Sequence, residues 1–166
     1  MDAKREAYPF AGALCVAAGN LMTAVHQAAG SPPTDDVDDL SADDRRLWTA
    51  AGVAYGAAAS CAALSARLLL VEREALREHV AEIDAPRRFE LGVTTLEATE
   101  ARAWRATVRA AAAARAELAR CAALYSARER GSDVADTVRQ LTDYVDELAA
   151  VLERIEPNAA PEDSSV

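Results

Sequence analysis

The chain has 166 residues and a formal net charge of −9 at pH 7, and 51% of its residues are hydrophobic although only 5% are aromatic. This length suits a single domain, and the negative charge makes nucleic acid an unfavourable partner because phosphate backbones repel it. The 41 alanines, against seven glycines and six prolines, predict an all-α protein with a core of small side chains, because alanine is the best helix former.

The first predicted helix covers residues 8–28. Gly30 and the two prolines that follow Ser31 mark its end. The segment 8–25 carries no formal charge, which bears on a membrane alternative given below. The apolar residues of this helix recur at spacings of three and four, which places them on one face, at Ala11, Leu14, Ala18, Leu21 and Val25.

The second predicted helix covers residues 42–85 and follows an acidic connector at 34–44. Ser41 and Asp44 have the spacing of a capping box at its start. No residue breaks the helix before Pro86, so it spans roughly 65 Å. Apolar residues surround the axis in its first half, which predicts contacts on several sides. In the second half they narrow to a two-helix contact made by Leu69, Leu76, Val80 and Ile83.

The third predicted helix covers residues 94–130, and Thr94 with Glu97 forms a capping box at its start. The segment 85–92, APRRFELG, lets the chain reverse, so the second and third helices are expected to form a hairpin. The charged far half of this hairpin is expected to protrude into solvent. Glu100 falls on the apolar side of its helix, and we expect an arginine across the hairpin, Arg73 or Arg77, to pair with it.

The fourth predicted helix covers residues 133–156, and it ends before Pro157. Residues 158–166 are expected to form a disordered tail. The predicted fold is an all-α, antiparallel four-helix bundle of one domain, residues 1–157, with two long central helices that form a protruding, coiled-coil-like hairpin. The last helix carries the clearest pattern in the chain, a heptad spacing of Val134, Val138, Leu141, Val145, Leu148, Leu152 and Ile155.

Cys15, Cys61 and Cys121 stand singly, without a CxxC pair. This spacing differs from a disulfide framework or a zinc knuckle and favours a reducing, cytoplasmic compartment. Packing explains each position because cysteine is a small, readily buried hydrophobe, and a soft-metal or redox cluster of the three is an alternative. The Glu-x-x-His motif of di-iron bundles, phosphate-binding loops and nucleophile elbows are absent. We therefore expect no catalytic, cofactor-binding or metal-binding residues, and no enzymatic activity.

The third predicted helix carries a stripe of arginines that reaches Arg130 and falls within about 80° on a helical wheel. Such a stripe suits an acidic protein, an anionic lipid or nucleic acid. The net negative charge and the lack of aromatic residues along the stripe favour a solvated face instead. The candidate interaction surface consists of Arg102, Arg105, Arg109 and Arg120, together with Leu148 and Leu152 of the last helix.

Abundant apolar helix faces and missing catalytic motifs favour a non-enzymatic scaffold or adaptor that acts through protein–protein interaction and self-associates as a homo-oligomer. These patterns do not identify the protein partner. One alternative is a membrane-associated protein that uses the apolar segments 8–28 and 49–71. The second segment is long enough to span a bilayer, at about 20 residues, although its many small residues do not favour insertion. Another alternative is a small metal or redox protein built around the three cysteines.

Overall fold

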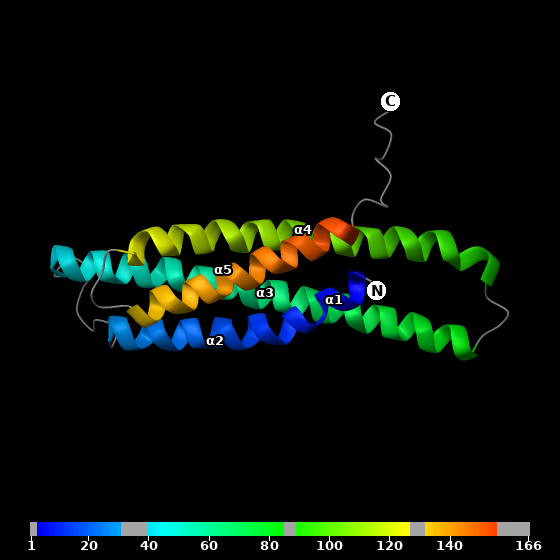
Figure 1. Ribbon diagram of the computed structural model, residues 1–166, viewed down its shortest axis with the longest axis horizontal. Coiled ribbons are helices and arrows are strands. Elements are labelled where there is room, and N and C mark those ends of the chain that lie inside the picture. The colour runs from blue at the N-terminus through cyan, green and yellow to red at the C-terminus, as the bar shows by residue number, and fades with distance from the viewer. Residues whose placement is uncertain (1–2, 31–39, 85–88, 127–131, 156–166) are drawn as a thin grey trace, which may run out of the picture.

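The computed structural model describes residues 3–30, 40–84, 89–126 and 132–155, with side chains described outside 74–99. Within these ranges the chain forms α-helices and no strand, so the predicted all-α helical bundle is confirmed (Figure 1). The helices are α1 (Ala3–Ala7), α2 (Pro9–Ala29), α3 (Ala42–Asp84), α4 (Phe89–Tyr125) and α5 (Ser132–Ile155).

The break between α1 and α2 falls at Tyr8, although Tyr8 itself keeps helical backbone angles, with φ −61° and ψ −39°. Proline follows it, and Pro9 has no N–H to donate to the carbonyl four residues earlier. Figure 1 shows α1 turned away from the axis of α2. The sequence prediction began this helix at residue 8 and missed α1.

Two caps flank the segment between α2 and α3. Gly30 ends α2 with a positive φ of 73°, which glycine adopts readily, and its N–H donates to the His26 carbonyl at 3.0 Å. At the start of α3 the N–H of Asp44 donates to Ser41 Oγ at 3.1 Å, and Ser41 Oγ donates to Asp44 Oδ2 at 2.6 Å. The predicted cap formed by Ser41 and Asp44 is therefore confirmed.

Helix α4 begins at Phe89, five residues before the predicted start at 94. Gly92 lies inside the helix, where one glycine lowers helix stability by only about 1 kcal/mol. The proposed capping box of Thr94 and Glu97 lies among residues whose side chains are not described. The predicted tail, 158–166, also lies outside the described residues.

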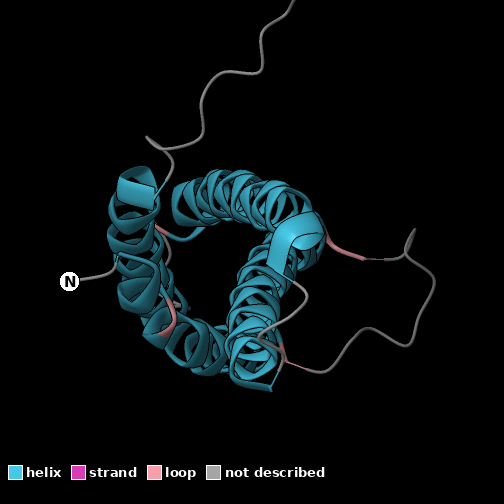
Figure 2. Cartoon of the chain, turned by 90° about the vertical axis from the view of Figure 1, so that its right-hand side faces the viewer, coloured by secondary structure: helices cyan, strands magenta, loops and turns pink. Residues whose placement is uncertain are grey.

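The four long helices are arranged in a ring when the molecule is viewed end-on (Figure 2). Helix α3 packs against α2 and α4, and α5 packs against the same two helices from the other side of the ring. In Figure 1 the chain runs out along α3 and returns beside it along α4, and both extend past α2 and α5. The short α1 packs mainly on α5, where Arg154 donates to Glu6.

The core differs from helix to helix in side-chain size. Helix α3 contributes small residues, among them the fully buried Ala54, Ala57 and Ala58, whereas α5 contributes larger ones such as Leu141 and Leu148. Small side chains allow neighbouring backbones to approach closely. One consequence is a direct bond between α3 and α2, in which the hydroxyl of Ser65 donates to the Ala11 carbonyl at 2.6 Å. The predicted inner face of α2 is confirmed, because all five of its residues are buried: Ala11, Leu14, Ala18, Leu21 and Val25.

The first half of α3 was expected to make contacts on several sides; it packs against α2 and α4, and its remaining side is open to solvent. Gly52 and Gly56 are exposed, and a Cβ atom added to either would meet no other atom within 4 Å. Leu69, which was assigned to the contact between the two central helices, is 52% exposed. Its neighbour Leu68 is buried instead. The ring leaves each helix one outward face, and that of α3 is uncharged between residues 47 and 66.

Candidate functional site

The arginine stripe lies on α4, and its members differ in exposure. Arg102, Arg109 and Arg120 are exposed, whereas Arg105 is half-buried and already engaged in an interaction. Arg120 donates to both carboxylate oxygens of Glu117, at 3.1 and 3.2 Å. Within the described part of the chain, no hydrogen bond or ion pair engages the guanidinium groups of Arg102 and Arg109. Of the described arginines in the stripe, these two are therefore the exposed ones that no described side chain engages.

Another arginine of α4, Arg115, lies outside the predicted stripe and joins two helices. Its Nε lies 2.8 Å from Asp146 Oδ1 on α5. Both side chains are well exposed, so the pair contributes at most about 1 kcal/mol to stability. The sequence could not assign this pair, because it depends on the register between α4 and α5.

Leu148 and Leu152 occupy a different environment from the arginines. Their exposed fractions are 0% and 2%, and both belong to the core that α5 shares with its neighbours. A partner protein could contact them only if the bundle opened. The candidate interaction surface therefore reduces to the arginines of α4, while Arg130, at the end of the predicted stripe, lies outside the described residues.

A polar cluster links α1 to α4, and it corrects the partner expected for Glu100. Lys4 of α1 forms an ion pair with Glu100, and the indole Nε1 of Trp104 donates to the same carboxylate at 3.3 Å. The ring of Tyr8 stacks on Trp104, with centroids 6.2 Å apart. The expected pairing with Arg73 is wrong, because the N-terminal segment, which the prediction did not include in a helix, covers this part of α4. The side chain of Arg77, the other expected partner, lies outside the described residues.

The three cysteines divide into one exposed and two buried side chains. Cys15 is exposed on α2, whereas Cys61 and Cys121 are fully buried on α3 and α4. Burial raises the pKa of both buried thiols from the ordinary 9.0 to about 11, which leaves them protonated and poorly nucleophilic at neutral pH. Among the described residues, no three His, Cys, Asp or Glu side chains are grouped so that they could hold a metal ion.

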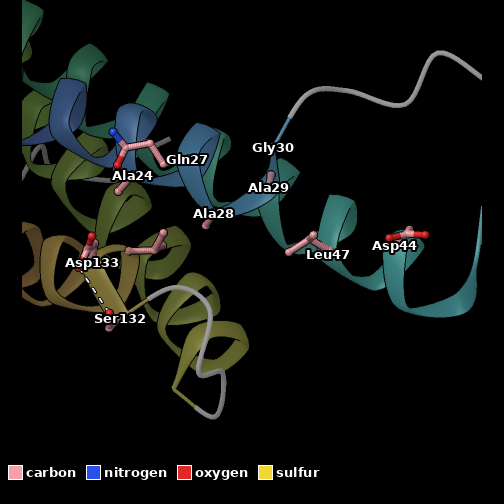
Figure 3. Close-up of a pocket in the computed structure, with 10 residues that line it drawn as sticks. Ala24, Gln27, Ala28, Ala29, Gly30, Asp44, Leu47, Ser132 and Asp133 are labelled. Atoms are coloured by element: carbon pink, nitrogen blue, oxygen red, sulfur yellow. Dashed lines mark hydrogen bonds between the residues drawn. The ribbon is translucent and has the colours of Figure 1, made fainter.

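A pocket of about 530 Å³ opens at the end of the bundle where α2 ends and α3 and α5 begin (Figure 3). Its ionisable lining residues are Asp44 and Asp133, and both act locally. Asp44 belongs to the cap of α3, and Asp133 accepts a long hydrogen bond of 3.4 Å from the hydroxyl of Ser132. Among the described residues that line it there is no histidine or cysteine to activate a nucleophile or bind a soft metal.

Two described stretches are long and apolar enough to cross a membrane by length and composition. They are Ala3–Ala29, with a mean hydropathy of 1.4, and Ala42–Arg73, with a mean hydropathy of 1.5. Core helices of soluble proteins meet the same criterion, and these two stretches supply much of the core here.

Comparison with known proteins gives no relative for this chain. No family model matches it, and neither the curated proteins nor the solved structures include a match.

Proposed function

We propose that this chain is a non-enzymatic helical scaffold or adaptor that binds an acidic protein segment on the outward face of α4. The observation that carries the proposal is the exposure of Arg102 and Arg109 on a chain whose net charge is −9. Seven residues separate these two arginines, so they lie two turns apart on one face, about 10.5 Å along the axis. An acidic helix or extended segment could pair with both.

The balance of charge between the helices supports this assignment. The exposed charged residues of α4 from Arg102 to Arg120 are arginines, and Glu117 there is already bonded to Arg120. By contrast, the exposed residues of α5 include Asp136, Asp143 and Glu147. A cationic face on an otherwise acidic molecule attracts and orients an acidic partner, because the rest of the acidic surface repels that partner.

Reversing the charge at Arg102 and Arg109 tests this proposal. Tagged wild-type protein and the Arg102→Glu/Arg109→Glu variant are used for affinity purification from the native source, followed by mass spectrometry. We expect the wild type to retain a partner with an acidic segment, and the variant to bind it at least about tenfold more weakly. Added salt should weaken the complex, because the contacts are between exposed charges.

A matched control changes the net charge by the same amount elsewhere. Arg45 of α3 and Arg139 of α5 are both exposed, so Arg45→Glu/Arg139→Glu should leave partner binding unchanged. Equal loss in the two variants would indicate a general charge effect, and full retention by Arg102→Glu/Arg109→Glu would contradict the proposed surface.

A membrane-associated function is the second candidate, and it is motivated by the two apolar stretches Ala3–Ala29 and Ala42–Arg73. Recovery of the native protein only in a carbonate-resistant membrane pellet would support this candidate over the scaffold.

A further inference from the structure

Helices α2 and α3 share an exposed surface on which Arg67, at its edge, is the charged residue between positions 47 and 70 of α3. Residues 9–29 contain no Asp, Glu, Lys or Arg, and neither do residues 47–66. In the helices of a soluble bundle, charged residues normally cover the outward side. Several large apolar residues are instead exposed here. We call this surface the uncharged face, and it is defined by Val16 and Met22 of α2 and by Gly56, Ala59, Ala63 and Leu70 of α3.

Large apolar side chains make this surface unfavourable in water. Val16 is 66% exposed and Met22 is 50% exposed on α2, and Leu70 is 57% exposed on α3. Large exposed apolar side chains on two helices that pack together indicate an interaction site in a soluble protein. The arginine face of α4 is separate from it, so this surface calls for its own partner.

Glycines within these helices indicate what kind of partner fits. A glycine in a helix interior lowers helix stability relative to alanine. Gly12, Gly19, Gly52 and Gly56 are all exposed, and a Cβ atom at any of them would meet nothing within 4 Å, so packing inside this chain does not require them. Gly52 and Gly56 also form a small-xxx-small pair, which lets another helix backbone approach closely.

The spacing on α3 matches contact with a second helix. From Gly52 onwards the exposed uncharged positions alternate by four and three residues, at Gly52, Gly56, Ala59, Ala63, Ala66 and Leu70. This is the repeat that keeps one side of a helix against a neighbouring helix. A surface built for lipid would carry Leu, Ile, Val or Phe at most of these positions, because alanine and glycine gain little from insertion.

The size of the uncharged face fits a second copy of the chain. About 18 residues of each helix give a length of about 27 Å, and two helices side by side are about 20 Å wide. If both surfaces are treated as flat, the two copies together would bury on the order of 1,100 Å² of surface. This is close to the roughly 1,200 Å² at which specific interfaces begin. A two-fold dimer uses the same patch on both copies, so no complementary chemistry is needed on a different molecule.

We infer that two copies of this chain associate through the uncharged face of α2 and α3. This inference goes beyond the proposed function, because it uses other helices and another partner. The two contacts also respond oppositely to salt. Each copy carries a net charge of −9 and the residues that define the interface are uncharged, so added salt screens repulsion and strengthens the dimer. The arginine contact weakens under the same conditions.

The test measures the mass of the full chain in solution by sedimentation equilibrium, over a range of protein and salt concentrations. We expect the wild type to form a dimer of the 17.6 kDa chain. Ala59→Glu/Ala63→Glu places four carboxylates in the interface and should raise the dimer dissociation constant more than about tenfold. Ala112→Glu/Ala116→Glu makes the same change at exposed positions on α4 and should leave the dimer unchanged.

Cys15 provides a second readout that needs no substitution in the interface. It lies next to Val16 and is exposed in the single chain, so its alkylation rate should fall as protein concentration rises. In Ala59→Glu/Ala63→Glu the rate should stay constant, with an unchanged far-ultraviolet circular dichroism spectrum. A wild-type chain that remains monomeric at every concentration would overturn the inference, and so would a dimer that both alanine variants retain. Flotation of monomeric wild type with neutral phosphatidylcholine vesicles would assign the face to lipid instead.

Discussion

Cys61 and Cys121 show how burial changes the chemistry of a single residue. Both are fully buried, and burial raises the pKa of each thiol to about 11. Cys15, by contrast, is exposed. The sequence pattern did not distinguish the three cysteines, because each lies on an apolar face of its predicted helix. The structure therefore places one of the three thiols in contact with solvent and two in the core.

The raised pKa values predict how stability depends on pH. In the unfolded chain these thiols ionise near the ordinary value of 9.0, whereas in the folded chain they remain protonated until about 11. Stability is therefore unaffected by them below about pH 9 and falls as the pH rises from 9 towards 11, because the unfolded state loses protons first. Urea unfolding under reducing conditions measures this decline.

The control for this prediction is Cys61→Ala/Cys121→Ala. Its absolute stability is lower because side-chain volume is lost from the core, but its stability should decline less steeply above pH 9 than that of the wild type. Parallel pH profiles for the two proteins would contradict the assignment to these thiols, since other alkaline titrations are common to both.

At the scale of the element, α5 shows the closest agreement between sequence and structure. Its heptad residues Val134 to Leu152 are buried as predicted, and Ile155 at the end is partly buried. The agreement has a physical cause: when apolar residues occupy one narrow stripe, only one orientation of the helix removes them from water. The leucines assigned to an interaction surface are therefore structural.

Substituting these leucines tests the structural role of α5. Leu148→Asp/Leu152→Asp would bury two carboxylates without partners, so the unfolding free energy should fall by more than about 4 kcal/mol, or folding should fail. Circular dichroism with urea gives this value. Ala150→Asp makes a similar change on the exposed side of the same helix and should alter stability by less than about 1 kcal/mol. Near-native stability of the double variant would show that α5 does not pack in the bundle.

At the scale of the whole molecule, one core connects all the helices. Buried residues of α1 to α5 form a single cluster, and α2 and α5 pack together although they are distant in sequence. The charge is divided between the two sides of the ring, with uncharged outward surfaces on α2 and on residues 47–66 of α3, and charged ones on α4 and α5. Two independent contacts can thus be made from opposite parts of the molecule.

The shared core predicts that the chain unfolds as one cooperative unit. Trp104 lies beside Tyr8, near α1, whereas Trp48 lies in the first turns of α3, towards the other end of the bundle. The Trp48→Phe variant keeps Trp104, so its fluorescence reports the end near α1. The Trp104→Phe variant keeps Trp48, so its fluorescence reports the end where α3 begins. In each variant the fluorescence midpoint should coincide with the midpoint from circular dichroism. Separate midpoints within either protein would indicate two independently folding units.

The sequence alone determined the helical class, the approximate extents of the long helices and their strongest inward faces, because alanine content, helix caps and apolar periodicity act between residues close together in the chain. Only the tertiary structure decided that Lys4 pairs with Glu100, that Cys15 is exposed while Cys61 and Cys121 are buried, and that one side of α3 is open. These features depend on register and on how many neighbours surround each helix. A chain in which alanine occupies every face does not encode them locally, since alanine is compatible with both burial and exposure.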